Sequence, residues 1–187
     1  PRLCEMLSQG VCSFLTTLKL GQNKLTDAGV GQPLVDVLRS EQCKLSSLDL
    51  SNNELTGAML ARAVRSNTSL TSLDFRGNTA VDDNALWVLG GLLLEEDCQC
   101  RIGVMRTYAF DVLEGATELS MRNTALALGA ARLLVSVFRF NDTITDLDLS
   151  NVGLVVQASH ALAKALRTNT TLTKLDISHN PLSDVSK

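Results

Sequence analysis

The sequence predicts an α/β fold made of repeated units, and three observations support this prediction. The stretch 45–55 reads L-x-x-L-x-L-x-x-N-x-L, in which Leu48 and Leu50 alternate along one face of a short strand. The same pattern returns along the whole chain at nearly regular intervals. Segments with the apolar period of a helix separate the copies.

Six copies of the pattern can be aligned by their first apolar position. The last three copies are evenly spaced, and the spacing of the first three varies only slightly around the same interval. The fourth copy is degenerate because Thr124 replaces the expected Asn. The six first positions are Leu15, Leu45, Leu70, Ala116, Ile144 and Leu172.

The copies and the segments between them resemble leucine-rich repeats of the ribonuclease-inhibitor type. The helical tail of that repeat matches residues 154–166 well and also matches residues 126–138. The resemblance covers nearly the whole chain, so we expect residues 1–187 to form a single domain. It implies a right-handed solenoid, a horseshoe segment with parallel strands on the concave face and helices on the convex face.

The segments between the copies predict the helices. Residues 27–40 form the first full helix with Asp27 as N-cap, although Pro33 predicts that the regular part starts near Gln32. Residues 57–66 predict a shorter helix, and the acidic pair Asp82-Asp83 opens the third. After residue 115 we expect strands at 117–122, 145–150 and 173–178, with helices at 127–140 and 156–168.

The regular spacing breaks at about residues 97–115. The stretch from Leu70 to Ala116 is too long for one repeat and too short for two. We expect a strand at 101–107 and then an irregular excursion that carries Tyr108 and Phe110, with the sheet continuing through it. The excursion is either an insertion that binds a partner or a degenerate repeat packed as core.

The two ends of the sequence predict a piece of a longer protein. Residues 2–9 look like the helix of a preceding repeat, and no helix follows the last strand. Terminal repeats of a solenoid need polar caps, and neither end shows one. The alternative is a complete chain whose ends are disordered.

The five cysteines predict a reducing setting. Cys12, Cys43 and Cys100 each precede the first core position of an expected strand by two or three residues, where a small buried thiol fits. Cys98 and Cys100 are too close together for the usual redox or zinc arrangement. We therefore expect the cytoplasm or another reducing intracellular compartment.

Three N-glycosylation sequons occur, at Asn67, Asn141 and Asn169. Each lies three residues before the first core position of a copy, where a helix ends. We expect a left-handed backbone at these positions, which Asn tolerates well, rather than a glycan.

No pattern in the chain predicts catalysis, a cofactor or a metal. His160 and His179 are isolated, and Gly90-Gly91 lies inside a helical segment, where it favours close packing over phosphate binding. A net charge of −3 gives no basic footprint for nucleic acid. No apolar run reaches the roughly 18–20 residues that a membrane span needs.

The residues between the leucines of each strand predict the binding surface, because they point away from the core. Their middle column reads Lys19, Asp49, Asp74, Ser120, Asp148 and Asp176. Carboxylates on strands about 4.8 Å apart repel one another, and a basic protein would relieve that repulsion. Alternatively the column reflects the repeat consensus L-D-L-S alone. The predicted concave-face residues are Lys19, Asp49, Asp74, Arg76, Glu118, Arg122, Asp148, Lys174 and Asp176.

Trp87 is a weaker candidate on the helical side, as Tyr108 and Phe110 are in the insertion. The repeat pattern leaves the Trp87 position facing outward, which suggests a protein contact. The alternative is a Trp half-buried against a neighbouring helix.

These observations favour a scaffold that binds other proteins within a larger assembly and is not an enzyme. The resemblance also implies two alternatives. One is a regulator, either an inhibitor of a basic enzyme or an activator of a small GTPase through Arg76, Asp82 and Asp83. The other is an innate-immune sensor whose repeats follow a nucleotide-binding domain.

Overall fold

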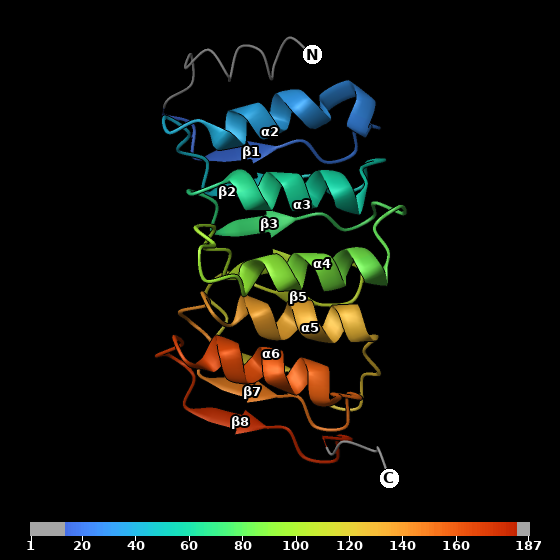
Figure 1. Ribbon diagram of the computed structural model, residues 1–187, viewed down its shortest axis with the longest axis vertical. Coiled ribbons are helices and arrows are strands. Elements are labelled where there is room, and N and C mark those ends of the chain that lie inside the picture. Colours follow the sequence, from blue (N-terminus) through green and yellow to red (C-terminus); the bar gives the residue numbers. More distant parts are fainter. Residues whose placement is uncertain (1–13, 183–187) are drawn as a thin grey trace.

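A computed structural model of the chain describes residues 14–182. Strands and helices alternate along it, and Figure 1 shows the helices stacked in one column with the strands behind them. The strands are β1 (Thr17–Lys19), β2 (Ser47–Asp49), β3 (Ser72–Asp74), β4 (Val104–Arg106), β5 (Asp111–Val112), β6 (Glu118–Ser120), β7 (Asp146–Asp148) and β8 (Lys174–Asp176). The helices are η1 (Asp27–Gly31), α2 (Gln32–Arg39), α3 (Gly57–Ser66), α4 (Asp83–Leu93), α5 (Leu128–Val137) and α6 (Val156–Leu166).

The strands pair in parallel and in the register that the repeat predicts. Leu48 lies beside Leu18 and Leu73, and Leu147 lies beside Leu119 and Leu175. These apolar side chains face the helices and join one core cluster that runs through the units. The architecture is therefore an α/β solenoid-like stack with parallel strands, as the sequence predicts.

The sheet does not continue through the irregular segment, so that expectation is wrong. β5 folds back antiparallel on β4, pairing Met105 with Val112 and Arg106 with Asp111. The first sheet ends at β5, and β6, β7 and β8 form a second sheet. An antiparallel strand turns a different pattern of N–H and C=O groups toward its next neighbour than a parallel strand does, which breaks the parallel ladder.

The irregular segment is a strand unit without a helix. Ile102 and Met105 are buried at the first and fourth positions of the repeat, and Phe110 and Val112 are buried where other copies have Asn and Leu. Ile102 follows Leu70 by about one repeat length, whereas the next copy begins only about half a repeat later, which explains the irregular interval. Residues 102–112 therefore follow the repeat pattern, and the chain passes to β6 without building a helix.

Because the unit at 102–112 has no helix, α4 of the preceding unit packs directly against α5 of the following unit. Gly90 of α4 lies against the backbone of Arg132 and Leu133 in α5, so close packing explains the Gly90-Gly91 pair. At the other end of the contact, the Asp83 carboxylate accepts hydrogen bonds from the backbone N–H groups of Gly129 and Ala130, at 2.9 and 2.8 Å. Asp82 caps α4 itself by accepting from Ala85 N–H. The two acids thus serve the N-termini of two adjacent helices.

Asp27 has the same bridging role and is not an N-cap. The first helical segment begins with the π-turn η1, whose N-cap is Thr26, and regular α-helix starts at Gln32 as Pro33 predicts. Asp27 instead accepts hydrogen bonds from the backbone N–H and the hydroxyl of Thr56, the N-cap of α3. A carboxylate in one unit therefore holds the start of the helix in the next.

Asparagines that follow the C-terminal ends of the strands connect neighbouring units. The Asn53 side chain accepts hydrogen bonds from the N–H groups of Asn23 and Leu25 and donates to the carbonyls of Leu20, Leu50 and Ser51. Asn78 and Asn180 make equivalent bonds to their preceding units. The recurrence of this Asn within the repeat thus has a purely structural cause.

The three sequon asparagines are also structural, but the predicted reason is wrong. Asn67 has a φ of −102°, and neither Asn141 nor Asn169 has a positive φ. Their side-chain oxygens accept N–H groups two and three residues later, and their amides donate to a carbonyl of an earlier segment. The left-handed position lies instead seven residues after the first apolar position, at Gln22, Asn52, Gly77, Asn123, Asn151 and His179.

Candidate protein-binding surfaces

The side of the strands that faces away from the helices is called the strand face here. The predicted middle column of residues lies on it in two groups, one on each sheet. Register places Lys19, Asp49 and Asp74 side by side on β1, β2 and β3, and it does the same for Ser120, Asp148 and Asp176 on β6, β7 and β8. The β4–β5 hairpin separates the groups. The sequence-predicted neighbours are therefore neighbours within each sheet.

Each aspartate of the column has a structural partner within its own repeat. Asp49, Asp74, Asp148 and Asp176 each accept a hydrogen bond from the backbone N–H two residues later, at 2.8 to 3.1 Å. The side chain and backbone N–H of Ser150 lower the pKa of Asp148, as those of Ser178 lower the pKa of Asp176. Hence the aspartates stabilise the end of each strand, which accounts for the repeat consensus.

An ionic cluster occupies the centre of the strand face, at the hairpin. Arg76 pairs with Asp74 at 2.7 Å and Arg106 pairs with Asp111 at 3.2 Å, while longer contacts of 3.8 and 3.9 Å cross-link the two pairs. Hydrogen bonding to Asp74 raises the pKa of Arg76. Arg106 and Asp111 were missed in the sequence, although the spacing of Ile102 and Met105 would have placed Arg106 in the column.

The second sheet carries the remaining predicted residues. Lys174 pairs with Asp146 on the adjacent strand at 2.6 Å, and this hydrogen bond raises the pKa of Lys174. Glu118 lies beside Asp146 in the same row, and Arg122 is exposed beyond the end of β6. The charged side chains of this sheet therefore lie together, and acids outnumber bases.

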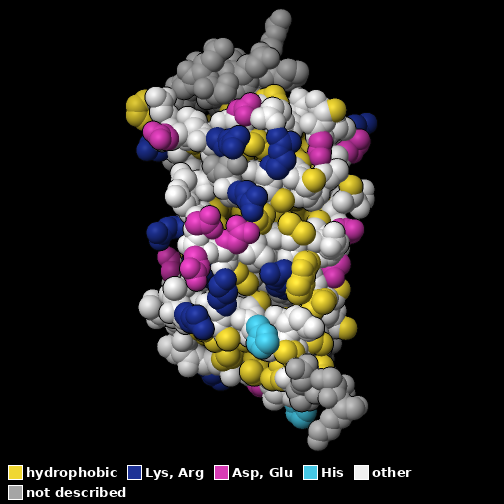
Figure 2. Space-filling model, viewed as in Figure 1, with side chains coloured by type: hydrophobic (Ala, Val, Ile, Leu, Met, Phe, Trp, Pro, Cys, Tyr) yellow, Lys and Arg dark blue, Asp and Glu magenta, His cyan; other side chains and the backbone are white. Residues whose placement is uncertain are grey.

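The strand layer and the helix layer carry opposite charges. The eight strands contain seven carboxylates and three basic side chains, whereas α2–α6 contain five basic side chains and two carboxylates. Figure 2 shows Lys and Arg side chains spread over the helix face, with a histidine in its lower half. The overall charge of −3 conceals this separation.

Trp87 is half-buried between helices, as the alternative interpretation proposed. The guanidinium carbon of Arg132 lies 4.0 Å from the centre of the Trp87 ring, and Arg132 Nη1 donates to the Trp87 carbonyl at 3.1 Å. Desolvation by burial lowers the pKa of Arg132. These two side chains line a pocket of about 390 Å³ together with Gly91, Leu94, Glu95, Gln157, His160, Ala161 and Lys164.

The two aromatic residues of the hairpin have different environments. Tyr108 is 55% exposed, and burial together with the nearby Asp83 and Asp82 raises the pKa of its phenol. Phe110 is only 5% exposed and packs in the core, so its side chain is not available to a partner. This corrects the assignment of Phe110 to a binding surface.

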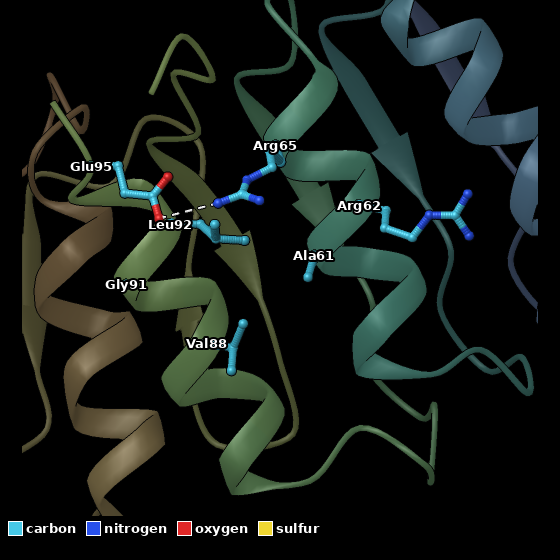
Figure 3. Close-up of a pocket in the computed structure, with 7 residues that line it drawn as sticks. All are labelled: Ala61, Arg62, Arg65, Val88, Gly91, Leu92 and Glu95. Carbon is cyan, nitrogen blue, oxygen red and sulfur yellow. Dashed lines mark ion pairs between the residues drawn. The ribbon is translucent and has the colours of Figure 1, made fainter. Parts of the chain in front are cut away.

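A second pocket, of about 340 Å³, lies between α3 and α4 (Figure 3). Val88 and Leu92 of α4 face Ala61 of α3 across it, and Arg65 pairs with Glu95 over one end at 3.5 Å. Arg62 points away from α4 toward α2, where it donates to the Gln32 side chain. The floor of this pocket is apolar, and its charged side chains are bound to other groups of the chain. The pocket therefore presents no set of side chains arranged for catalysis.

The described residues contain little reactive chemistry. Within residues 14–182 no group of three His, Cys, Asp or Glu side chains could hold a metal ion. No helix in this range is long and apolar enough to cross a membrane.

Cys43, Cys98 and Cys100 are free thiols, and burial raises the pKa of Cys100 to about 12. Cys12 and the helix expected at residues 2–9 lie outside the described residues.

Family profiles match four stretches of the chain. A profile described as "Leucine Rich repeat" matches residues 11–31, 66–86 and 168–186. A second, "Leucine Rich Repeat", matches residues 44–61. All four stretches contain a copy of the strand pattern, so the profiles and the structure agree on the repeating unit.

Curated relatives and a solved structure extend this similarity. The chain is 38% identical over 91 residues to NACHT, LRR and PYD domains-containing protein 3 of Macaca mulatta, covering 47% of this chain and 9% of that protein. It is 36% identical over 131 residues to protein 9 of the same series from Bos taurus, covering 68% and 12%. The fold is similar to Leiomodin-1 Actin-Binding Site 2, with a TM-score of 0.55, 12% identity and coverage of 90% and 87%. The chain thus spans about a tenth of the length of its curated relatives.

Proposed function

Because the chain is a leucine-rich-repeat protein, we propose that it is a protein-binding scaffold module without catalytic activity. The observation that supports this most directly is the exposed strand face, on which short strands in register hold rows of charged side chains. The Asn and Asp hydrogen bonds fix these rows before a partner arrives, so binding would order few side chains. The module would act by presenting a rigid surface.

The strand face would be the concave side of a right-handed solenoid, and its partner would carry a basic surface. Each strand–helix–strand connection joins parallel strands of one sheet, and such connections are almost always right-handed. Seven carboxylates against three basic side chains on the strands favour a basic partner. The candidate contacts are Lys19, Asp49, Asp74, Arg76, Glu118, Arg122, Asp148, Lys174 and Asp176.

Replacing three of the aspartates with uncharged asparagines tests this surface. Asp49→Asn, Asp148→Asn and Asp176→Asn together remove three charges but keep the oxygen that accepts the backbone N–H. We expect recovery of a basic partner from cell extract at low salt to fall by about tenfold, because each exposed ion pair contributes up to about 1 kcal/mol. The measurement is quantitative mass spectrometry of the proteins that co-purify with each variant.

The matched control removes the same charge elsewhere. Glu41→Gln, Asp97→Asn and Asp142→Asn neutralise three exposed acids that lie outside the strands. This variant should recover the same partners as the unchanged chain. If both variants recover identical partners in identical amounts, the strand face is not the binding surface.

A regulator of an enzyme is the second candidate. An acidic strand face suits inhibition of a basic enzyme, and adding the chain to a basic ribonuclease at low salt would test that. Activation of a small GTPase through Arg76, Asp82 and Asp83 has less support. Arg76 is paired with Asp74, and both acids cap helices within the chain.

We also propose that the chain acts as one part of a longer intracellular protein. The names of the curated relatives combine LRR with a NACHT and a PYD domain, and the chain spans about a tenth of their length. Free thiols at Cys43, Cys98 and Cys100 suit a reducing compartment. Sequencing the complete transcript would test the first point directly.

A further inference from the structure

We propose that the pocket between α4, α5 and α6 on the helix face binds an acidic segment of a partner protein. This pocket is a different surface from the strand face, and its charge has the opposite sign. The ligand would place a carboxylate between Arg132, His160 and Lys164 and an apolar side chain against Trp87.

The pocket brings basic groups from two helices onto one aromatic floor. Arg132 of α5 lies over the Trp87 ring of α4, and α6 contributes His160 and Lys164, four residues apart and so on one face of the helix. Leu94 and Ala161 complete the apolar part of the lining. A volume of about 390 Å³ has room for one or two side chains of a ligand and not for a folded surface.

The basic groups of the pocket lack a carboxylate partner within the described chain. Among residues 14–182, no carboxylate lies within 4.0 Å of a side-chain nitrogen of Arg132 or Lys164. The acid that lines the pocket, Glu95, is paired with Arg65. A half-buried guanidinium without a counter-ion is costly, and a carboxylate from outside would supply the missing charge.

An acidic peptide fits this pocket better than nucleic acid or a second copy of the chain. Nucleic acid needs a row of basic residues along its phosphates, whereas the acids Glu95, Glu96 and Asp97 follow α4 directly beside the pocket. The strand face of a second copy is acidic, but its column aspartates are already held by backbone N–H groups. A short acidic segment needs to place only one carboxylate between Arg132, His160 and Lys164, so it does not require a row of basic residues.

Trp87 is the only tryptophan of the chain, so its fluorescence reports on this pocket. The probe is a short glutamate-rich peptide with one central leucine, titrated into the full chain at low salt. Lys164→Glu changes an exposed side chain and should weaken binding by about fivefold to tenfold, because two unit charges change near the ligand. Lys44→Glu makes the same change on an exposed loop residue far from the pocket and should alter binding less than about twofold.

Arg132→Gln provides a second variant, which keeps a planar polar group over Trp87 but removes its charge. It should also weaken the peptide, whereas the strand-face Asn variant should bind it unchanged, which separates this proposal from the proposed function. No change in Trp87 fluorescence, or equal weakening by Lys164→Glu and Lys44→Glu, overturns the proposal. A response to a single-stranded oligonucleotide but not to the peptide, or low-salt oligomers that Lys164→Glu abolishes, would overturn it in favour of nucleic acid or a second copy.

Discussion

Single asparagine side chains hold neighbouring repeats together in this protein. Asn53 is only 4% exposed and connects its own turn to two N–H groups and one carbonyl of the unit before it. A side chain with both a donor and an acceptor can satisfy two backbones at once, which Asp or Leu at the same position could not do. The repeat therefore needs Asn here for hydrogen bonding rather than for its backbone conformation.

Replacing Asn53 with Ala should reduce the free energy of unfolding by about 2–3 kcal/mol, because the N–H groups of Asn23 and Leu25 lose their acceptor and buried carbonyls lose a donor. Urea denaturation followed by circular dichroism measures the change. Asn84→Ala, at an exposed position of α4, is the control and should stay within about 0.5 kcal/mol. Equal stability of the two variants would contradict the structural role of Asn53.

The sequon asparagines illustrate how a correct position can have a wrong explanation. Asn67 and Asn141 were expected to adopt a left-handed backbone, yet both are buried and use the side chain to close a turn. Their amides also donate to the preceding segments, at Leu38 and Gly103. A glycan on either nitrogen would remove these bonds, so the motif N-x-S/T arises here from turn chemistry.

Among the elements, the contact between α4 and α5 decides how the two sheets are joined. The strand ladder is broken between β5 and β6, so the helices and the core carry the connection. Glycines permit this contact, because Gly90 and Gly129 allow the helix backbones to approach closely. A Cβ on Gly129 would lie 1.8 Å from the carbonyl oxygen of Asp83.

Gly129→Ala should therefore destabilise the chain by about 2 kcal/mol or more, since the helices must separate to make room. Helix propensity alone predicts the opposite sign, because Ala is favoured over Gly by about 1 kcal/mol within a helix. Thermal unfolding measures which effect dominates. Gly29→Ala is the control, because its Cβ would meet nothing closer than the Thr26 hydroxyl at 3.4 Å. A Gly129→Ala variant more stable than the parent would show that the helices pack less tightly than described.

Across the molecule, the helix-free unit changes the relative lengths of the two layers. In an ordinary repeat the strand spacing is about 4.8 Å and the helix spacing is about 8–10 Å, so the sheet lies on the inside of a curve. From β3 to β6 the strand layer contains two extra strands, which add about 10 Å to the ordinary strand spacing, while α4 and α5 remain in direct contact. The curvature should therefore be interrupted at this point.

Deleting residues 102–115 tests this reasoning. The deletion removes the β4–β5 hairpin and brings the first apolar positions of β3 and β6 close to the spacing of the other copies. Because α4 and α5 already touch, we expect β6 to pair with β3 in one continuous parallel sheet. Small-angle X-ray scattering should then give a folded, shorter and more curved particle than the parent. An unfolded or aggregated product would show that the core needs the hairpin.

Local patterns in the sequence were sufficient to predict the repeating unit, the parallel register and the residues that face outward from the strands. These features follow from the period of two along a strand and from the regular spacing of Leu and Asn, which each unit carries within itself. The same kind of reasoning placed Asp82 and Asp83 at a helix N-terminus and predicted close packing at Gly90-Gly91.

Packing between units, by contrast, sets where the sheet is split, which charges meet and what covers Trp87. Arg106 and Asp111 belong to a hairpin whose pattern is hidden by Thr107 and Phe110 at positions that other copies fill with Leu and Asn. Asp83 reaches α5 across 46 residues, and Arg132 reaches Trp87 across 45. Contacts between units depend on the distance between neighbouring units, and no local pattern within one unit encodes that distance.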